Sequence, residues 1–120
     1  MSNKTIYFKV TNNIPHIDEL RWSTLSLTEQ MANIGSEVGR TLKWMEKGKM
    51  NFAEGAFIRA LDLMDATIKY GRQNSPLRNN LLVELCRARE LFAESYQNRD
   101  IDTCSYLNKY FGQFASALRR

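Results

Sequence analysis

The chain contains only one histidine, His16, and two cysteines, Cys86 and Cys104. A metal site in a helical bundle generally takes histidines and carboxylates that project inward at matched heights, and zinc needs several histidine or cysteine ligands. One histidine beside a proline does not supply them, so we expect no metal and no cofactor. Two cysteines do not make a disulfide framework, and we expect both to be small buried side chains.

The sequence also lacks a long apolar run. No stretch approaches the length that spans a bilayer, and the first residues, Met1-Ser2-Asn3-Lys4, do not begin a signal peptide. We therefore expect a cytoplasmic protein without a membrane partner. A glycine-rich phosphate loop is missing too, because Gly35-Ser36-Glu37-Val38-Gly39 lies inside a helical pattern instead of between a strand and a helix.

Charge of one sign is not concentrated in any part of the sequence. The net charge of +4 in 120 residues divides into small sums of +1, 0, 0, +2 and +1 over residues 1–25, 26–47, 48–70, 71–99 and 100–120. A nucleic-acid interface usually appears as a clustered basic patch. This distribution favours a solvated surface, and nucleic acid stays the alternative.

Four stretches carry helix start signals. Ser26 and Asn51 are each followed three residues later by a glutamate, Pro76 suits a first helical position after Ser75, and Asp100 and Asp102 form the fourth signal. These signals predict helices over residues 27–47, 52–70, 76–97 and 101–118, with Gly48 and Gly71 ending the first two. Short connections make consecutive helices antiparallel neighbours.

Apolar residues recur at three- and four-residue spacing in all four helices, which places them on inward seams. The predicted inward residues are Leu27, Met31, Ile34, Val38, Thr41 and Met45; Ala53, Phe57, Ala60, Leu61, Met64 and Ile68; Leu81, Leu85, Ala88, Phe92 and Tyr96; and Leu107, Phe111, Phe114 and Leu118. The predicted fold is all-α: an antiparallel up-and-down four-helix bundle over residues 26–120, preceded by an extended N-terminal arm over residues 1–25.

Residues 5–10 alternate apolar and polar side chains and so predict one short strand. No second clear strand follows, and Ile14-Pro15-His16 is expected to be an irregular connection before a short turn at residues 18–22. A single strand must pair with something or stay extended. The predicted strand therefore pairs with another copy, pairs with a partner protein, or forms an arm.

Carboxylates four or fewer residues apart do not make a catalytic site here. The pairs Asp62/Asp65 and Glu90/Glu94 share helix faces, but helical nucleotide-cleaving enzymes need several acids that converge from two helices. Arg59 precedes Asp62 by three residues and Lys69 follows Asp65 by four, which are the usual spacings of ion pairs on a helix surface. We interpret both pairs as solvated faces and expect no catalytic residues.

Two glycines four residues apart, Gly35 and Gly39, are unusual inside a helix, because each costs about 1 kcal/mol relative to alanine. The pair indicates a close crossing with a helix of the same chain, a crossing between two copies, or a ligand slot. Beside it we predict an interaction groove, in which a polar stripe leads toward Trp44. The groove residues are Asn33, Gly35, Glu37, Gly39, Arg40, Arg59 and Asp65.

Three aromatic residues are candidates for a protein interface. Trp22 precedes the first long helix, and Tyr106 and Tyr110 lie four residues apart beside the inward seam of the last one. Tyrosine is enriched at surfaces that bind other proteins. Stacking on nucleic-acid bases beside Lys109 is the alternative for the two tyrosines.

The run from Trp22 to Val38, WSTLSLTEQMANIGSEV, followed by ALDLMDATI at residues 60–68, resembles small bacterial helical proteins of unassigned function. The resemblance covers residues 22–118 and implies a fold without an activity. More distantly, the helix layout is similar to HEPN-type bundles that accompany minimal nucleotidyltransferases. Ribonuclease members of that group use an arginine followed four to six residues later by a histidine, which this chain lacks after His16.

The functional expectation from the sequence is a non-enzymatic protein-interaction module that forms a homodimer or binds a protein partner. The alternative is a nucleotide- or RNA-contacting component of a toxin–antitoxin or nucleotidyltransferase pair.

Overall fold

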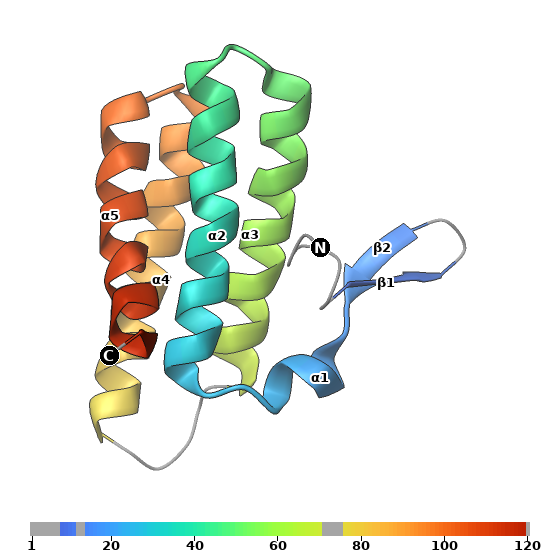
Figure 1. The fold of residues 1–120 in the computed structure, drawn as a ribbon, viewed down its shortest axis with the longest axis vertical. Helices are drawn as coiled ribbons and strands as arrows, with labels where there is room; N and C mark the ends of the chain where they lie inside the picture. The colour runs from blue at the N-terminus through green and yellow to red at the C-terminus, as the bar shows by residue number, and fades with distance from the viewer. Residues whose placement is uncertain (1–7, 12–13, 71–75, 120) are drawn as a thin grey trace.

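The computed structural model describes residues 8–11, 14–70 and 76–119. Its elements are β1 (Phe8–Thr11), β2 (Ile14–Ile17), α1 (Glu19–Ser23), α2 (Leu27–Glu46), α3 (Met50–Tyr70), α4 (Pro76–Gln97) and α5 (Ile101–Leu118). In the described part of the chain the only sheet is a two-stranded one, so the all-α prediction is confirmed. Figure 1 shows the long helices α2, α3, α4 and α5 side by side.

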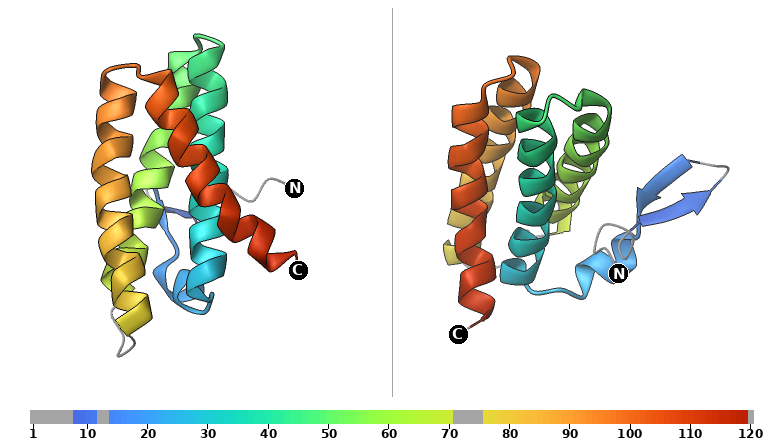
Figure 2. Two further views of the ribbon diagram at one scale, coloured as in Figure 1. Left: turned by 90° about the vertical axis from the view of Figure 1, so that its left-hand side faces the viewer. Right: turned by 45° about the horizontal axis from the view of Figure 1, so that its top comes forward.

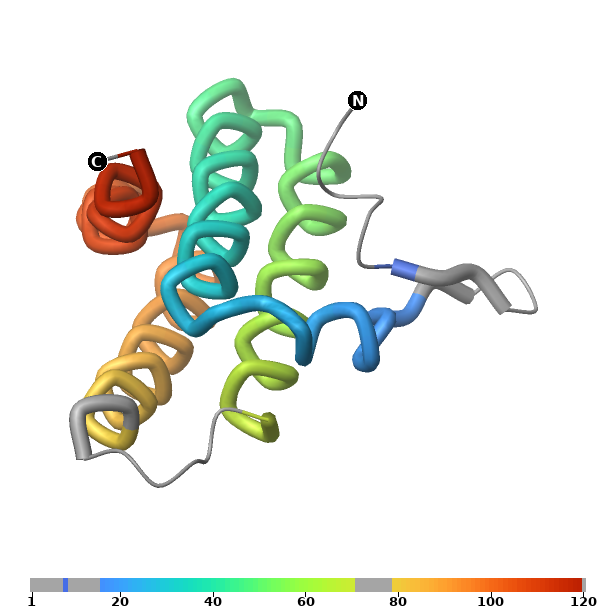
Figure 3. The backbone as a smooth tube through the Cα atoms, turned by 60° about the horizontal axis from the view of Figure 1, so that its bottom comes forward, coloured from blue at the N-terminus to red at the C-terminus, as the bar shows by residue number. Residues whose placement is uncertain are grey.

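Helix α2 occupies the middle of the structure. Seen from below in Figure 3, it lies between α3 and α5, while α4 packs against α3 and α5 behind it. Figure 2 shows α5 crossing α2 obliquely. Because α2 is central, one of its sides faces α3 and another faces α5. Each polar residue of α2 therefore has a different neighbouring helix, depending on its side.

Two of the predicted helix starts are confirmed in atomic detail. The Ser26 hydroxyl accepts a hydrogen bond from the Glu29 backbone N–H at 3.1 Å, and the Glu29 carboxylate accepts one from the Ser26 N–H at 2.9 Å. At the last helix, Asp100 accepts a hydrogen bond from the Thr103 N–H at 3.1 Å. These bonds satisfy N–H groups that have no partner within the helix, and they lower the pKa of Glu29. The pKa of Asp100 is lowered first by the hydrogen bond from the Thr103 hydroxyl and then by the one from the Thr103 N–H.

The predicted start at Asn51 is wrong, because α3 begins at Met50. Gly48 adopts a positive φ of 70°, which ends α2 and reverses the chain within three residues. The Lys49 carbonyl then accepts the Ala53 N–H at 3.1 Å, so the helical hydrogen bonds start before Asn51. The other two predicted signals, Gly71 and Ser75, lie outside the described residues.

All six seam residues predicted for α2 are buried, and so are most of those predicted for the other helices. The core also contains residues that the seams omitted: Trp22, Leu63, Ala66 and Cys104. Two predictions are wrong, because Leu118 is 49% exposed and Cys86 is exposed. Leu118 is the last residue of α5.

Residues 8–11 and 14–17 form two paired strands, so the prediction of one unpaired strand with an irregular connection is wrong. β1 pairs antiparallel with β2, from Phe8 opposite Ile17 to Thr11 opposite Ile14. β2 is only four residues long and contains Pro15. A strand this short with a proline shows no clear alternation of apolar and polar residues in the sequence. Each strand has one neighbour in this sheet, so a proline without an N–H is tolerated. Residues 5–7 of the predicted strand lie outside the described residues.

Helix α1 anchors the N-terminal segment to α3 through Trp22, which is completely buried. The Trp22 indole N–H donates to the Thr67 hydroxyl at 3.0 Å, and the Gln30 amide donates to the Trp22 carbonyl at 3.0 Å. The prediction that Trp22 is an exposed interface aromatic is therefore wrong. The sequence predicted a short turn at residues 18–22, where the structure has helix α1. The burial of Trp22 was not predicted, because one apolar residue in so short a helix makes no periodic pattern.

The two glycines of α2 let α5 approach closely. A Cβ atom added at Gly35 would lie 2.8 Å from the Phe111 Cβ, and one at Gly39 would lie 3.0 Å from the Asn108 Oδ1. The glycine pair thus serves a crossing within the chain, the first of the alternatives considered from the sequence. The space over the glycines is filled by α5 and leaves no slot there.

Alanine substitutions at two helical glycines should have opposite effects on stability. We expect Gly35→Ala to lower the free energy of unfolding by about 1–3 kcal/mol, because its methyl group must displace the α5 backbone. Gly112→Ala is the matched control: no atom lies within 4 Å of its added Cβ, so it should stabilise by about 1 kcal/mol through helix propensity. Urea unfolding of both variants measures the difference, and equal shifts would contradict the close crossing.

Candidate functional site

The predicted interaction groove divides between opposite sides of α2. Successive helical residues are 100° apart, so Glu37 points about 200° away from Gly35. The glycines face α5, while Glu37 reaches Arg59 on α3. The predicted groove included both glycines beside the polar stripe of Asn33, Glu37 and Arg40, and that assignment is wrong for the glycines.

Three of the groove residues do come together, as an ion cluster between α2 and α3. The Arg59 Nε donates to the Glu37 Oε2 at 3.1 Å, and the Arg40 Nη1 lies 3.3 Å from the Glu37 Oε1. The Glu37 side chain is 2% exposed, whereas Arg40 and Arg59 are 30% and 27% exposed. The Arg40–Glu37 contact lacks hydrogen-bond geometry, so it is electrostatic. One buried carboxylate thus holds two guanidinium groups at the surface.

The remaining groove residues make separate contacts. The Asn33 amide donates to the Glu29 carbonyl of its own helix at 2.8 Å. Asp65 pairs with Arg89 of α4 through bonds of 2.6 and 3.1 Å to the two carboxylate oxygens. Neither residue contacts the ion cluster.

A hollow of about 250 Å³ lies where the N-terminal segment meets α3. It is lined by His16, Ile17, Glu19, Asp62, Asp65, Ala66 and Lys69. Glu19 accepts a 2.6 Å hydrogen bond from the Tyr70 hydroxyl, which lowers its pKa, and lies 3.5 Å from the Lys69 Nζ. Partial burial, and then repulsion by Asp65, raise the pKa of Asp62.

The tyrosines predicted for an interface line a second hollow, of about 260 Å³, between α4 and α5. Tyr106 is 64% exposed, while Tyr110 is half-buried with its hydroxyl donating to the Glu84 Oε1 at 2.7 Å. Burial, reinforced by that hydrogen bond, raises the pKa of Tyr110. The rest of the lining is Arg87, Ala88, Leu91 and Leu107, so this surface is largely apolar with charges at its edge.

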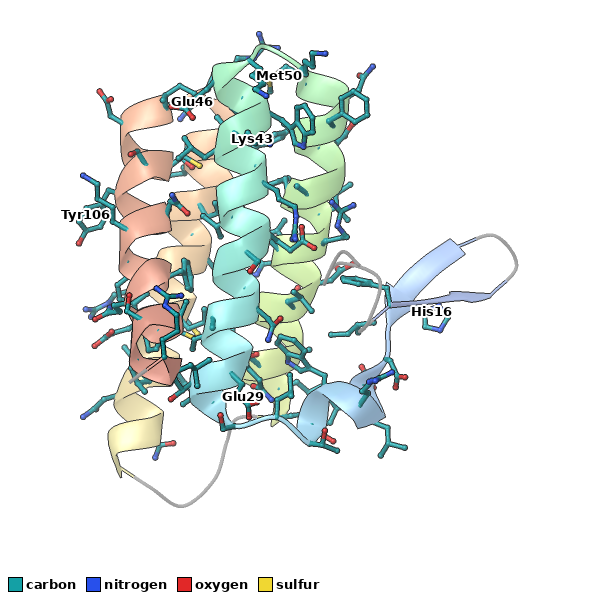
Figure 4. The ribbon with its side chains drawn as sticks, in the orientation of Figure 1. His16, Glu29, Lys43, Glu46, Met50 and Tyr106 are labelled. Atoms are coloured by element: carbon teal, nitrogen blue, oxygen red, sulfur yellow. The ribbon has the colours of Figure 1, made fainter. Side chains whose placement is uncertain are left out.

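A third surface surrounds Trp44. The sequence predicted a polar stripe that leads to Trp44, but not the neighbouring lysines and Phe52 as part of a site. The Trp44 ring on α2 lies 4.9 Å from the Phe52 ring on α3, measured between centroids. The ammonium groups of Lys43 and Lys47 lie 5.6 and 5.4 Å from the centre of the Trp44 ring. Figure 4 shows Lys43 on the α3 side of α2 and Glu46 on the α5 side. The signal in the sequence was basic residues at three- and four-residue spacing around a tryptophan.

Groups for nucleophilic or metal chemistry do not gather anywhere in the described residues. Within them, no three histidine, cysteine or acidic side chains are placed to hold a metal ion. Cys104 is buried, and that burial raises the pKa of its thiol to about 11. In the same part of the chain no helix has both the length and the apolar character needed to cross a membrane.

No protein-family model matches the sequence, and neither a curated protein nor a solved structure matches it. The resemblance to small bacterial helical proteins and to HEPN-type bundles therefore stays a prediction.

Removing the charge of Glu37 should destabilise the protein. Glu37→Gln keeps the shape of the side chain but leaves Arg40 and Arg59 without a counter-charge. We expect the free energy of unfolding to fall by about 1–3 kcal/mol, below the full cost of a buried pair because both arginines reach water. The control Asp65→Asn breaks an exposed pair and should cost less than about 1 kcal/mol. Equal losses of unfolding free energy for Glu37→Gln and Asp65→Asn, measured by urea unfolding, would contradict the difference between the buried and the exposed pair.

Neutralising Asp62 should have the opposite effect. Because the folded state raises the pKa of Asp62 above 3.8, ionisation of this group at pH 7 opposes folding. We expect Asp62→Asn to raise the urea midpoint at pH 7, and the gain to vanish as the pH falls below 3.8, where the wild-type carboxyl is protonated in both states. Unfolding curves at pH 7 and pH 3 test this; a gain that persists at pH 3 would argue against it.

Proposed function

We propose that this protein is a non-enzymatic self-associating module, which forms a homodimer through the hollow between α4 and α5. In this proposal the long helices act as an antiparallel up-and-down bundle that presents a fixed surface, in the cytoplasm of a bacterium. No catalytic residue and no cofactor is assigned. The observation that supports it is the apolar, partly exposed lining of the α4–α5 hollow, built around Leu91 and Tyr106.

The exposure of these two side chains favours a contact surface. Leu91 is 43% and Tyr106 is 64% exposed, and they stand on two different helices beside the same hollow. Burying apolar area contributes roughly 25 cal/mol per Å², and tyrosine is a frequent anchor of protein interfaces. The hydrogen bond from Tyr110 to Glu84 holds one wall of the hollow in place before any partner arrives.

The charges around the hollow favour a second copy as the occupant. In a twofold-symmetric dimer the same patch meets itself, so it must be complementary to its own surface. Glu84 and Arg87 both line this hollow and carry opposite charges one helical turn apart. A twofold axis between them would bring the Arg87 of each copy toward the Glu84 of the other, around an apolar centre.

Placing a charge in the hollow should prevent dimer formation. We expect Leu91→Arg to convert the dimer to a monomer, because an arginine in the apolar centre would be buried without a counter-charge. Ile58→Arg is the matched control, since Ile58 is 49% exposed but lies on α3 outside the hollow. Light scattering of the full chain over a range of concentrations reports the mass. The full chain is used, because a version that starts at Ser23 would lack the buried Trp22.

Three results would overturn the proposal. The first is a wild-type monomer at every concentration tested. The second is a dimer that survives Leu91→Arg, which would place the interface elsewhere. The third is a dimer lost in Ile58→Arg and kept in Leu91→Arg, which would move the interface to α3. Circular dichroism melting of each variant shows that a change in mass does not come from unfolding.

A further inference from the structure

Aromatic and basic side chains from α2 and α3 meet on one face of the molecule, which we name the cationic aromatic surface. On α2, residues 40, 43, 44 and 47 recur at three- and four-residue spacing and so share one side of the helix. On α3, residues 52 and 59 are two turns apart on the side that faces α2. The surface consists of Arg40, Lys43, Trp44, Lys47, Phe52 and Arg59.

The aromatic part of this surface is accessible. The Phe52 side chain is 60% exposed. It packs against the half-buried Trp44 ring at 4.9 Å with an interplanar angle of 33°. Trp44 thus supports Phe52 from one side and leaves the rest of the Phe52 ring open to solvent. A supported, exposed ring is a platform on which a planar group can stack.

The basic part of the surface surrounds that platform. Lys43 and Lys47 hold their ammonium groups within 5.6 Å of the centre of the Trp44 ring, which is cation–π distance. Arg40 lies one turn earlier on α2, and Arg59 reaches the same side from α3. Cations therefore occur on successive turns of α2, over roughly 10 Å of the helix axis.

The acids near this surface do not cancel its charge. Glu37 lies beneath Arg40 and Arg59 and is buried, so the four cations exceed the acids of the cluster by three charges. Glu46 lies on the α5 side of α2, and its charge adds to burial in raising the pKa of Cys104. The charge of Glu54 likewise adds to burial in raising the pKa of Tyr96 on α4. In the described residues neither Glu46 nor Glu54 forms an ion pair with one of these four cations.

We propose that the cationic aromatic surface binds single-stranded nucleic acid. A base stacks on the Phe52–Trp44 pair, and the phosphates that flank it lie against Lys43, Lys47 and the two arginines. Sequence-tolerant binders of single strands combine these two elements, stacking aromatics and a positive track for the backbone. This goes beyond the proposed self-association, and it uses the side of the molecule formed by α2 and α3, away from the α4–α5 hollow.

Two other polyanionic partners fit the surface less well. An anionic membrane is flat and would need cations spread over the end of the bundle, whereas Arg40, Lys43 and Lys47 lie along one side of α2. An acidic peptide would satisfy the cations but would have no use for the exposed Phe52 ring. Three of these cations, Arg40, Lys43 and Lys47, follow the axis of α2, which suits a linear chain of phosphates.

Binding of a fluorescein-labelled twelve-residue oligo-U RNA, followed by fluorescence anisotropy at 50 mM salt, tests the proposal. We expect Phe52→Ala to weaken binding about fivefold or more, as loss of one stacked base does. The double variant Lys43→Gln/Lys47→Gln should weaken it further and reduce the slope of log K against log salt by about 1.4, since each phosphate contact in a single strand contributes about 0.7.

Matched controls separate this surface from general attraction. Val83→Ala removes an apolar side chain of α4 that is 53% exposed and lies outside the hollow, and Lys109→Gln/Arg119→Gln removes two exposed cations from α5 and its C-terminal cap. Both should leave the affinity within about twofold of the wild type. Because all six substituted side chains are exposed, the variants should keep the wild-type melting temperature within a few degrees.

The proposal is overturned if the wild type does not bind the RNA at 50 mM salt, or if the two double variants lose affinity equally. It is also overturned if binding to poly-glutamate, or to vesicles containing phosphatidylserine, is as tight as binding to the RNA. Since Leu91→Arg should leave RNA binding intact and Phe52→Ala should leave the dimer intact, failure of this proposal is distinguishable from failure of the self-association.

Discussion

The close approach of α2 and α5 at Gly35 fixes the arrangement of every surface described above. With no side chain at Gly35, the α5 backbone at Phe111 comes within contact distance, and Phe111 itself is completely buried. That contact commits one side of α2 to α5. The side of α2 that carries Glu37, Arg40 and Trp44 is thereby turned toward α3 and solvent, where it joins Arg59 and Phe52.

The same crossing explains why the charges look dispersed in the sequence and concentrated in space. Over residues 26–47 the acids and bases cancel. In the folded chain, however, Glu46 lies on the α5 side of α2 and Lys43 on the α3 side, while Glu37 is buried beneath two arginines. Summing charge along the sequence hides a separation between the two sides of one helix. Fold and charge pattern therefore have to be considered together before a partner is excluded.

The parts of the fold that sequence reasoning predicted are those governed by local rules. The α2 seam and the Ser26 and Asp100 caps depend on spacing within one or two turns, and the structure contains all of them. The pairing of β1 with β2, the burial of Trp22 and the start of α3 at Met50 were not predicted. They depend on a four-residue strand with a proline, on a contact with distant Thr67, and on the reversal at Gly48, which leave no periodic pattern. In the candidate groove, only Glu37, Arg40 and Arg59 came together, because the glycines face the opposite way.

The anchoring of the N-terminal segment by Trp22 has a consequence for how the chain folds and opens. The indole N–H and the Thr67 hydroxyl are separated by 45 residues, so this contact forms only after α2 and α3 have paired. The segment before α2 is therefore expected to dock late and to detach first, as a unit of lower stability than the long helices. Each detachment uncovers the apolar surface of α3 that the indole covers. A protease that cleaves near Ser23 would trap that state, and the helices left behind would carry a permanently exposed patch.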